Sequence, residues 1–122
     1  MDLHAAVDAD VVLAAGQIAL IPTGLEVAIP DGYEGQVRPR SGLAVSAGIS
    51  LPNTPATIDA GLSRRDPVPL INLGREPFLV TRGMRIAQFV VAPVMRVAWD
   101  EVSRAAATQT VRAGQGFGHS GV

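Results

Sequence analysis

Residues 68–91 read VPLINLGREPFLVTRGMRIAQFVV, and this stretch decides the fold class. It contains three short runs of apolar or alternating residues, at 68–73, 78–80 and 85–91, each bounded by Gly, Pro, Asn or Asp. Runs of this length with these boundaries are typical of β-strands. The stretch therefore predicts a β-rich protein.

The same pattern continues towards the N-terminus. Residues 17–22 (QIALIP) and 25–30 (LEVAIP) are further strand candidates, and nine prolines spread along the chain fit strand ends and turns. Short strands at this spacing predict an all-β sandwich or barrel. One short helix is expected in RSGLAVSAG (residues 40–48), with Ser41 as its N-cap and Gly48 as the residue that ends it.

Composition limits the function classes. A chain of 122 residues forms one domain. It has no apolar run near the about 18 residues of a membrane span, and its first residues lack the basic region of a signal peptide. We therefore expect a cytoplasmic protein. The chain has no cysteines, which excludes disulfides and thiolate zinc sites, and its net charge of −1 offers no basic field for a nucleic-acid polymer. Any nucleotide that it binds should be small.

Three separated segments carry candidate chemistry. RPRSGLA places an arginine and Ser41 at a helix start, where free N–H groups favour an anion, although a serine there is usually only a cap. RGMRIAQFV carries Arg85 and Gln88 on an otherwise apolar strand, as an ordinary sheet edge also would. NTPATIDAG places Asp59 at a strand end, where most aspartates stabilise the turn.

Taken in order, these segments match a known family. The chain resembles the homotrimeric dUTP diphosphatase (dUTPase) family over nearly its whole length, through five motifs: DLHAA (2–6), RSGLA (40–44), NTPATIDAG (53–61), RGMRIAQ (82–88) and RAGQGFGHSG (112–121). The resemblance implies an all-β, jelly-roll-like subunit with one short helix. It also implies a homotrimer whose active sites each borrow residues from neighbouring subunits.

The resemblance further implies two parts in the chain. Residues 1–111 would form the β-barrel domain, and residues 112–122 a glycine-rich arm that closes over bound nucleotide. In that arm, Phe117 would stack on the uracil ring and Arg112 would reach the terminal phosphates. Glycines suit this role because they let the backbone approach phosphate closely.

The implied reaction is attack of water on the α-phosphorus of dUTP, which yields dUMP and pyrophosphate. Asp59 would be the general base. A Mg²⁺ ion held by the triphosphate would touch Asp2 through water. The implied substrate-binding residues are Arg40, Ser41, Gly42, Asn53, Leu62, Arg85, Gln88, Arg112, Phe117 and Gly118.

The chain departs from the family pattern after Asp59. Leu62 stands where the family has a tyrosine under the deoxyribose, which predicts poorer sugar discrimination. Arg64 replaces a turn glycine, which predicts a changed hairpin. Pro67 falls where the family presents a main-chain N–H to the uracil O4, so one base-specific hydrogen bond would be missing. The chain also begins at the first motif, without the strand that normally precedes it.

Three interpretations therefore stay open. The first is a working dUTPase with a modified hairpin. The second is a trimeric scaffold with the same fold that has lost turnover, either naturally or by engineering. The third is a relative of the dCTP deaminases. The product formed from the nucleotide distinguishes them: pyrophosphate is expected for the first, no product for the second and ammonia for the third.

Overall fold

The computed structural model describes residues 1–61, 63–64 and 67–101, and within them the chain is almost entirely β-structure. The prediction of an all-β fold with one short helix is confirmed. In chain order the elements are β1 (Asp2–His4), β2 (Val11–Leu13), β3 (Ile18–Ile21), β4 (Val27–Ala28), β5 (Tyr33–Pro39), α1 (Ser41–Ala47), β6 (Ile49–Ser50), β7 (Ala56–Ile58), β8 (Ser63–Arg64), β9 (Val68–Asn72), β10 (Phe78–Val80) and β11 (Arg85–Pro93).

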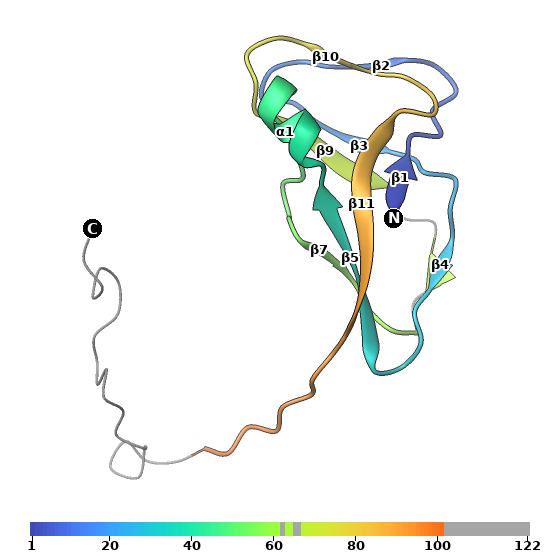
Figure 1. Ribbon diagram of the computed structural model, residues 1–122, viewed down its shortest axis with the longest axis vertical. Helices are drawn as coiled ribbons and strands as arrows, with labels where there is room; N and C mark the ends of the chain where they lie inside the picture. The colour runs from blue at the N-terminus through green and yellow to red at the C-terminus, as the bar shows by residue number, and fades with distance from the viewer. Residues whose placement is uncertain (62, 65–66, 102–122) are drawn as a thin grey trace, which may run out of the picture.

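The strands pair antiparallel in four groups. The largest sheet has the order β1-β11-β5-β7, and a three-stranded sheet has the order β3-β9-β6. Two further pairs are β10-β2 and β4-β8. β5 and β11 are the longest strands and lie side by side through the molecule (Figure 1). Together they connect the α1 end of the molecule to its opposite end.

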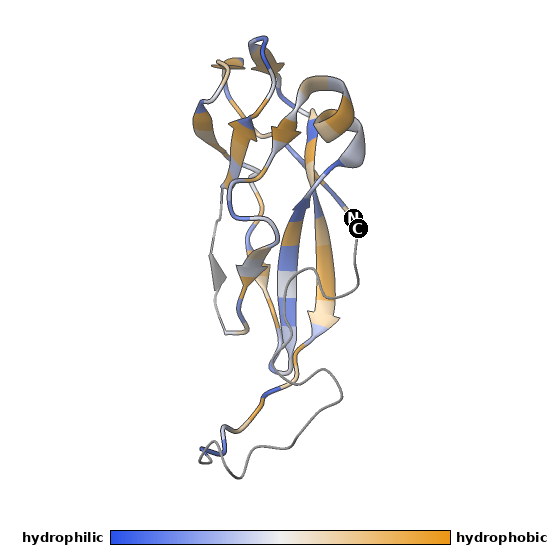
Figure 2. Ribbon diagram, turned by 90° about the vertical axis from the view of Figure 1, so that its left-hand side faces the viewer, coloured by the Kyte–Doolittle hydropathy of each residue, from blue (hydrophilic) through white to orange (hydrophobic). Residues whose placement is uncertain are grey.

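The predicted strands agree with the observed ones. The runs at 17–22, 25–30 and 68–73 contain β3, β4 and β9, and the run at 78–80 coincides with β10. β11 extends two residues beyond the predicted end, to Pro93, because its pairing with β5 continues to Tyr33. Burial alternates through the middle of β5, as expected for a strand with one buried face, whereas β11 is continuously apolar from Phe89 to Ala92 (Figure 2).

A single cluster of buried aliphatic side chains and one phenylalanine forms the core. β9 contributes Val68 and Leu70 from alternate positions, and β11 contributes Ile86, Ala87 and Phe89. β5 passes close to the Phe89 ring at Gly35, where a Cβ would lie 2.7 Å from a ring carbon. The core therefore lies between the large sheet and the strands that face it.

The helix α1 begins one residue earlier than a Ser41 cap requires. Ser41 is its first helical residue, whereas Arg40 occupies the N-cap position in extended conformation and makes no side-chain capping bond. The prediction of Ser41 as N-cap is therefore wrong, and the Ser41 hydroxyl is not needed to close the helix. Across the described ranges, no helix is long and apolar enough to span a bilayer.

Gly48 ends α1 as predicted. Its φ of 69° is left-handed, and its N–H donates to the carbonyl of Ala44. A Cβ on Gly48 would lie 2.5 Å from the backbone N of Gly74, which belongs to the loop after β9. The carbonyl of Gly48 also accepts the N–H of Leu73 at 2.9 Å. The end of α1 is thus held directly against the loop that follows β9.

Asn72, the last residue of β9, organises that loop. It is 0 % exposed. Its Nδ2 donates to the carbonyls of Leu13 and Glu76, both at 2.8 Å, and its Oδ1 accepts the N–H of Gly74 at 2.9 Å. A buried amide whose donors and acceptor are all used stabilises a single arrangement of the loops around it.

Replacing Asn72 with leucine should strongly lower the free energy of unfolding. The change leaves two carbonyls and one N–H without their partner, and each such buried group costs about 1–3 kcal/mol. We expect a loss of at least ~3 kcal/mol in urea unfolding at fixed protein concentration. The neighbouring Leu73→Ala, at a side chain that is 67 % exposed, should change stability by no more than about 0.5 kcal/mol. Equal stability of Asn72→Leu and the wild type would contradict this role.

Replacing Gly48 with alanine should also destabilise the fold, because the new Cβ meets the backbone of Gly74. The left-handed conformation alone costs a non-glycine residue about 1–3 kcal/mol. Gly42→Ala is the matched control: nothing lies within 4 Å of its Cβ, and alanine favours a helix over glycine by about 0.5–1 kcal/mol. Thermal unfolding of both variants checks the prediction, and a Gly48→Ala protein as stable as Gly42→Ala would refute it.

Candidate functional site

The large sheet brings four predicted site residues to one place. Asp2 on β1 pairs directly with Gln88 on β11, and Arg85 begins the same strand. Arg40 follows the last residue of β5, whose Pro39 pairs with Ala87. The hydrogen bond from the N–H of Phe89 to the carbonyl of Met1, at 2.7 Å, continues the β1–β11 pairing past Asp2. We call Asp2, Arg40, Arg85 and Gln88 the arginine cluster.

The carboxylate of Asp2 lies between the two guanidinium groups of the arginine cluster. Its Oδ1 is 3.3 Å from Nε of Arg40, and its Oδ2 is 3.4 Å from Nη1 of Arg85. The Nε of Arg40 is buried, yet its geometry towards Asp2 does not meet that of a hydrogen bond, and it has no other partner within the described structure. The cluster therefore carries a net positive charge and an unused donor, both suited to an anion.

The start of α1 adjoins the arginine cluster. Nη1 of Arg40 donates to the carbonyl of Arg85 at 3.4 Å, which ties the residue before α1 to the first residue of β11. Ser41 and Gly42 come next and are exposed. The Ser41 hydroxyl is not used as a cap, and the backbone N–H groups of Ser41 and Gly42 lie in the first turn, where a helix supplies no partner.

Sequence reasoning missed Arg38. On β5 it pairs with Gln88, so Asp2, Gln88 and Arg38 form one row across three strands. Its Nε donates to Oε1 of Gln36 at 3.0 Å. The alternation of Glu34, Gln36 and Arg38 along β5 was the available signal, since alternate residues of a strand share one face.

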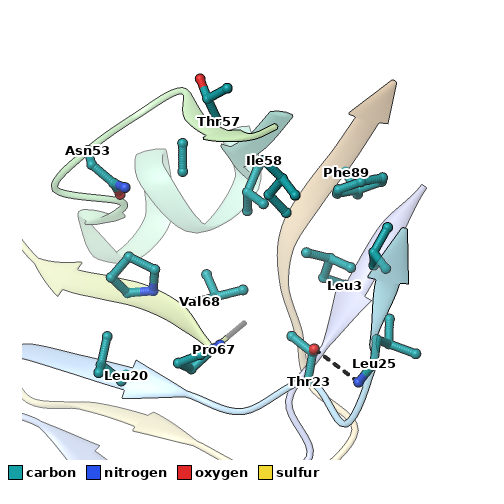
Figure 3. Close-up of a pocket in the computed structure, with 14 residues that line it drawn as sticks. Leu3, Leu20, Thr23, Leu25, Asn53, Thr57, Ile58, Pro67, Val68 and Phe89 are labelled. Atoms are coloured by element: carbon teal, nitrogen blue, oxygen red, sulfur yellow. Dashed lines mark hydrogen bonds between the residues drawn. The ribbon is translucent and has the colours of Figure 1, made fainter. Parts of the chain in front are cut away.

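A cavity of about 370 Å³ lies between the large sheet and the strands that face it (Figure 3). Its walls are mainly apolar, including Leu3, Val68 and Phe89. Asn53 and Pro67 also line it, so two residues predicted to meet the base do share one cavity. A cavity of this kind, apolar with few polar groups, is typical of sites for small molecules.

Asp59 lies far from the arginine cluster within one chain. It is exposed and directly follows β7, whose last residue, Ile58, pairs with Gly35 near the start of β5. Arg40 lies beyond the other end of β5. A strand advances about 3.3 Å per residue, so roughly 17 Å separate Gly35 from Arg40. A single chain therefore does not bring Asp59, the predicted general base, together with the predicted phosphate-binding residues.

The remaining predicted residues fall partly outside the structure. Leu62, Arg112, Phe117 and Gly118 lie outside the described residues. Arg64 belongs to the strand β8, where its backbone is paired with Val27 in extended conformation. A position in a strand needs no positive φ, which removes the expected penalty for arginine there.

No group of three or more His, Cys, Asp or Glu side chains in the described part of the chain is arranged to hold a metal ion. A divalent cation in this site would thus need ligands from a bound molecule, with Asp2 as the carboxylate of the arginine cluster. Chemically, the arginine cluster is suited to phosphate and the cavity to a ring.

Comparison with known proteins identifies close relatives. The family model described as dUTPase matches residues 1–121. The chain is 50% identical over 122 residues to the deoxyuridine 5'-triphosphate nucleotidohydrolase of Rickettsia felis, covering 100% of this chain and 81% of the relative. It is 52% identical over 124 residues to the protein of the same name from Rhizobium etli, covering 100% of this chain and 78% of that one.

Solved structures show the same fold. A mutant dUTPase of Staphylococcus bacteriophage 80alpha in complex with dUpNHpp matches with a TM-score of 0.82 and 26% identity, over 99% of this chain and 85% of that one. A mutant dUTPase from phage phi11 of S. aureus, in which a structural Mg(II) ion is coordinated, matches with a TM-score of 0.76 and 21% identity, over 87% of this chain and 84% of that one.

Proposed function

The chain belongs to the dUTPase family, and from this membership we propose that it hydrolyses dUTP to dUMP and pyrophosphate in a site completed by neighbouring copies. The structural feature that carries the proposal is the arginine cluster, which places phosphate-binding groups beside the start of α1. Relatives about half identical over the whole chain are named as dUTP nucleotidohydrolases. Nothing in the structure or in these relatives favours a catalytically impaired scaffold or a deaminase.

The reaction needs a base and phosphate-binding groups. Asp59 accepts a proton from the attacking water, which forms a bond to the α-phosphorus while the bond to the bridging oxygen of the β-phosphate breaks. Arg85, Gln88 and the Ser41 hydroxyl hold phosphate oxygens, and Gly42 offers a backbone N–H. Arg40 supports them through its bond to the carbonyl of Arg85. The products are dUMP and pyrophosphate.

The uracil ring occupies the cavity lined by Asn53 and Pro67. The side-chain amide of Asn53 has both donors and an acceptor for the polar edge of the base. Pro67 has no N–H, so Asn53 carries more of the recognition here than in relatives with a donor at that position. Leu62 takes the place below the deoxyribose and gives apolar contact without a flat ring.

Magnesium fits this arrangement as a companion of the substrate. Among the described residues, no three His, Cys, Asp or Glu side chains are grouped so that they could hold the ion alone. Mg²⁺ commonly binds through one or two carboxylates together with substrate phosphates and water. Bound to the triphosphate, it would neutralise charge and orient the pyrophosphate leaving group. Asp2 is the residue that would contact its water shell.

The C-terminal residues complete the site. We assign residues 1–111 to the β-barrel domain and residues 112–122 to an arm that closes over the nucleotide. Arg112 would reach the terminal phosphates, Phe117 would stack on the uracil ring, and Gly118 would let the backbone approach closely.

The separation of Asp59 from the arginine cluster supports a homotrimer with shared sites. One chain places the two parts roughly 17 Å apart along β5, too far for one α-phosphate to touch both. Beyond β11 the chain runs away from the body of the molecule (Figure 1). There Met95, Val97 and Trp99 are 87 %, 73 % and 94 % exposed. An alternating apolar face of this kind fits a contact with a neighbouring copy.

Hydrolysis of dUTP tests the proposed function directly. Pyrophosphate release is measured with Mg²⁺ and with chelator, for the wild type and for Asp59→Asn. Loss of a general base should lower kcat by about 10²- to 10⁴-fold while nucleotide binding remains, and chelation should lower kcat/KM of the wild type. UTP, dCTP and dTTP in the same assay measure selectivity.

The matched control for Asp59→Asn is Asp8→Asn. Asp8 is also an exposed aspartate, and it pairs with Arg82 at 3.4 Å, a residue outside the arginine cluster. Its kcat should equal that of the wild type. A folded wild type that releases no pyrophosphate from dUTP would refute the function, and an unchanged kcat in Asp59→Asn would remove Asp59 from the mechanism.

Mixing two inactive variants tests the shared site. Asp59→Asn keeps an intact arginine cluster, and Arg85→Ala keeps an intact Asp59. If the two parts come from different copies, co-refolding equal amounts should restore activity at about a quarter of the sites by random assortment. If each chain carries its own complete site, the mixture stays inactive, and this outcome rejects the shared site.

A further inference from the structure

The strand β11 contains a β-bulge at the point where it carries the phosphate-binding side chains. Leu3 on β1 lies opposite Ala87. The next residue of β1, His4, lies opposite Arg85, so the register skips Ile86. Ile86 is therefore an extra residue on β11. Bulges of this kind redirect the side chains of the strand that contains them, and they are common next to active sites.

The bulge decides which face of the large sheet Arg85 occupies. In a regular strand alternate residues share a face, so Arg85 and Gln88, three positions apart, would lie on opposite faces. In the structure, Ile86 and Ala87 are both buried, at 1 % and 0 % exposure, and both belong to the core. Arg85 instead contacts the carboxylate of Asp2, whose position on β1 is opposite Gln88. The extra residue therefore brings Arg85 and Gln88 to one face.

Backbone hydrogen bonds on both sides of the bulge keep the extra residue in place. On one side, the N–H of Phe89 donates to the carbonyl of Met1 at 2.7 Å. On the other side, the N–H of Ala5 donates to the carbonyl of Met84 at 2.8 Å. The chain advances four residues from Met1 to Ala5 but five from Met84 to Phe89. A regular pairing of the two segments would therefore break one of these bonds.

The bulge requires a small side chain at position 87. β11 lies between β1 and β5 in the sheet, so Ala87 has Leu3 opposite it on one side and Pro39 on the other. Adjacent residues of a regular strand point to opposite faces and do not compete for space, but Ile86 and Ala87 both pack into the core. Because a packed core has little spare volume, a larger side chain at position 87 would displace Ile86 and disturb the bulge.

We propose that Ala87 is a positioning residue, whose small side chain permits the bulge that directs Arg85 and Gln88 towards the same phosphate group. The inference deepens the proposed function and rests on the arginine cluster being its phosphate site. Ala87 is buried and acts through Arg85. Without the bulge, only one of the two side chains would face the phosphate.

The test is a double-mutant cycle of Ala87→Val and Arg85→Ala, in which calorimetry measures the Kd of inorganic pyrophosphate with Mg²⁺. Arg85→Ala should weaken binding by about tenfold to hundredfold, as expected for a lost hydrogen bond to a charged group. Ala87→Val should weaken binding at least about fivefold in the wild type but less than about twofold in Arg85→Ala, where no guanidinium remains to be misdirected. Equal effects in both backgrounds, or none in the wild type, would overturn the proposal.

Two control variants separate positioning from a general loss of stability. Ala87→Gly leaves room for Ile86, so its Kd should stay within about twofold of the wild-type value although glycine weakens a strand. Val80→Ile enlarges another buried side chain, which is 0 % exposed on β10, and should lower stability without changing the Kd. If either variant bound pyrophosphate as weakly as Ala87→Val, the effect would be one of core packing, and the role of Ala87 would be rejected.

A measurement on the wild type covers the case in which Ala87→Val does not fold. If Arg85 and Gln88 face one phosphate group, the Nε–Hε resonance of Arg85 and the side-chain amide resonances of Gln88 should shift together as pyrophosphate and Mg²⁺ are added. A shift of only one of them, or of neither, would overturn the proposal. Turnover of dUTP by the same sample distinguishes the two hypotheses: its absence while both resonances shift would refute the reaction alone.

Discussion

The buried amide of Asn72 is the interaction that organises the loops against which the end of α1 packs. It holds the carbonyls of Leu13 and Glu76 and the N–H of Gly74, so the end of β2 and the loop after β9 keep one arrangement. Gly48 then fits against Gly74 with no space for a Cβ. This contact fixes the end of α1, and a seven-residue helix fixed at one end also has a fixed start. The position of Ser41 and Gly42 is thus fixed from both sides: by this contact at the far end of the helix, and by the Arg40–Arg85 hydrogen bond and the Pro39–Ala87 pairing just before its start.

β5 is the second constraint on the site, because it positions both of the site's parts. Its C-terminal end leads into Arg40 and α1, and its N-terminal half pairs with β7, which ends just before Asp59. Since an extended strand is rigid in length, no local rearrangement brings Asp59 to the arginine cluster within one chain. The same strand that orders each part keeps them apart, and this separation is what the proposed site shared between copies explains.

The sequence predicted α1 and the strands β3, β4, β9, β10 and β11 because their signals are local, whereas β1, β2, β5, β6 and β8 were not predicted. Apolar runs bounded by Gly, Pro and Asn marked the strands, and Gly48 marked the end of α1, where a left-handed φ suits glycine. The start of α1 was predicted wrongly: serine is a common cap, but here the chain leaves β5 through Pro39 and Arg40, and Arg40 takes the cap position. Arg38 and Asn72 were missed because one depends on cross-strand register and the other on contacts with distant loops.

The sequence by itself determined three things: the family, the β-rich fold and the residue types of the proposed site. Each could be predicted because motifs and alternation are properties of neighbouring positions. The pairing of Asp2 with two arginines, the common cavity of Asn53 and Pro67, and the distance of Asp59 from the arginine cluster came only from the folded chain. These features join residues far apart in sequence. Their geometry depends on strand register and on the packing of one sheet against another, and neither can be deduced from a single segment of the sequence.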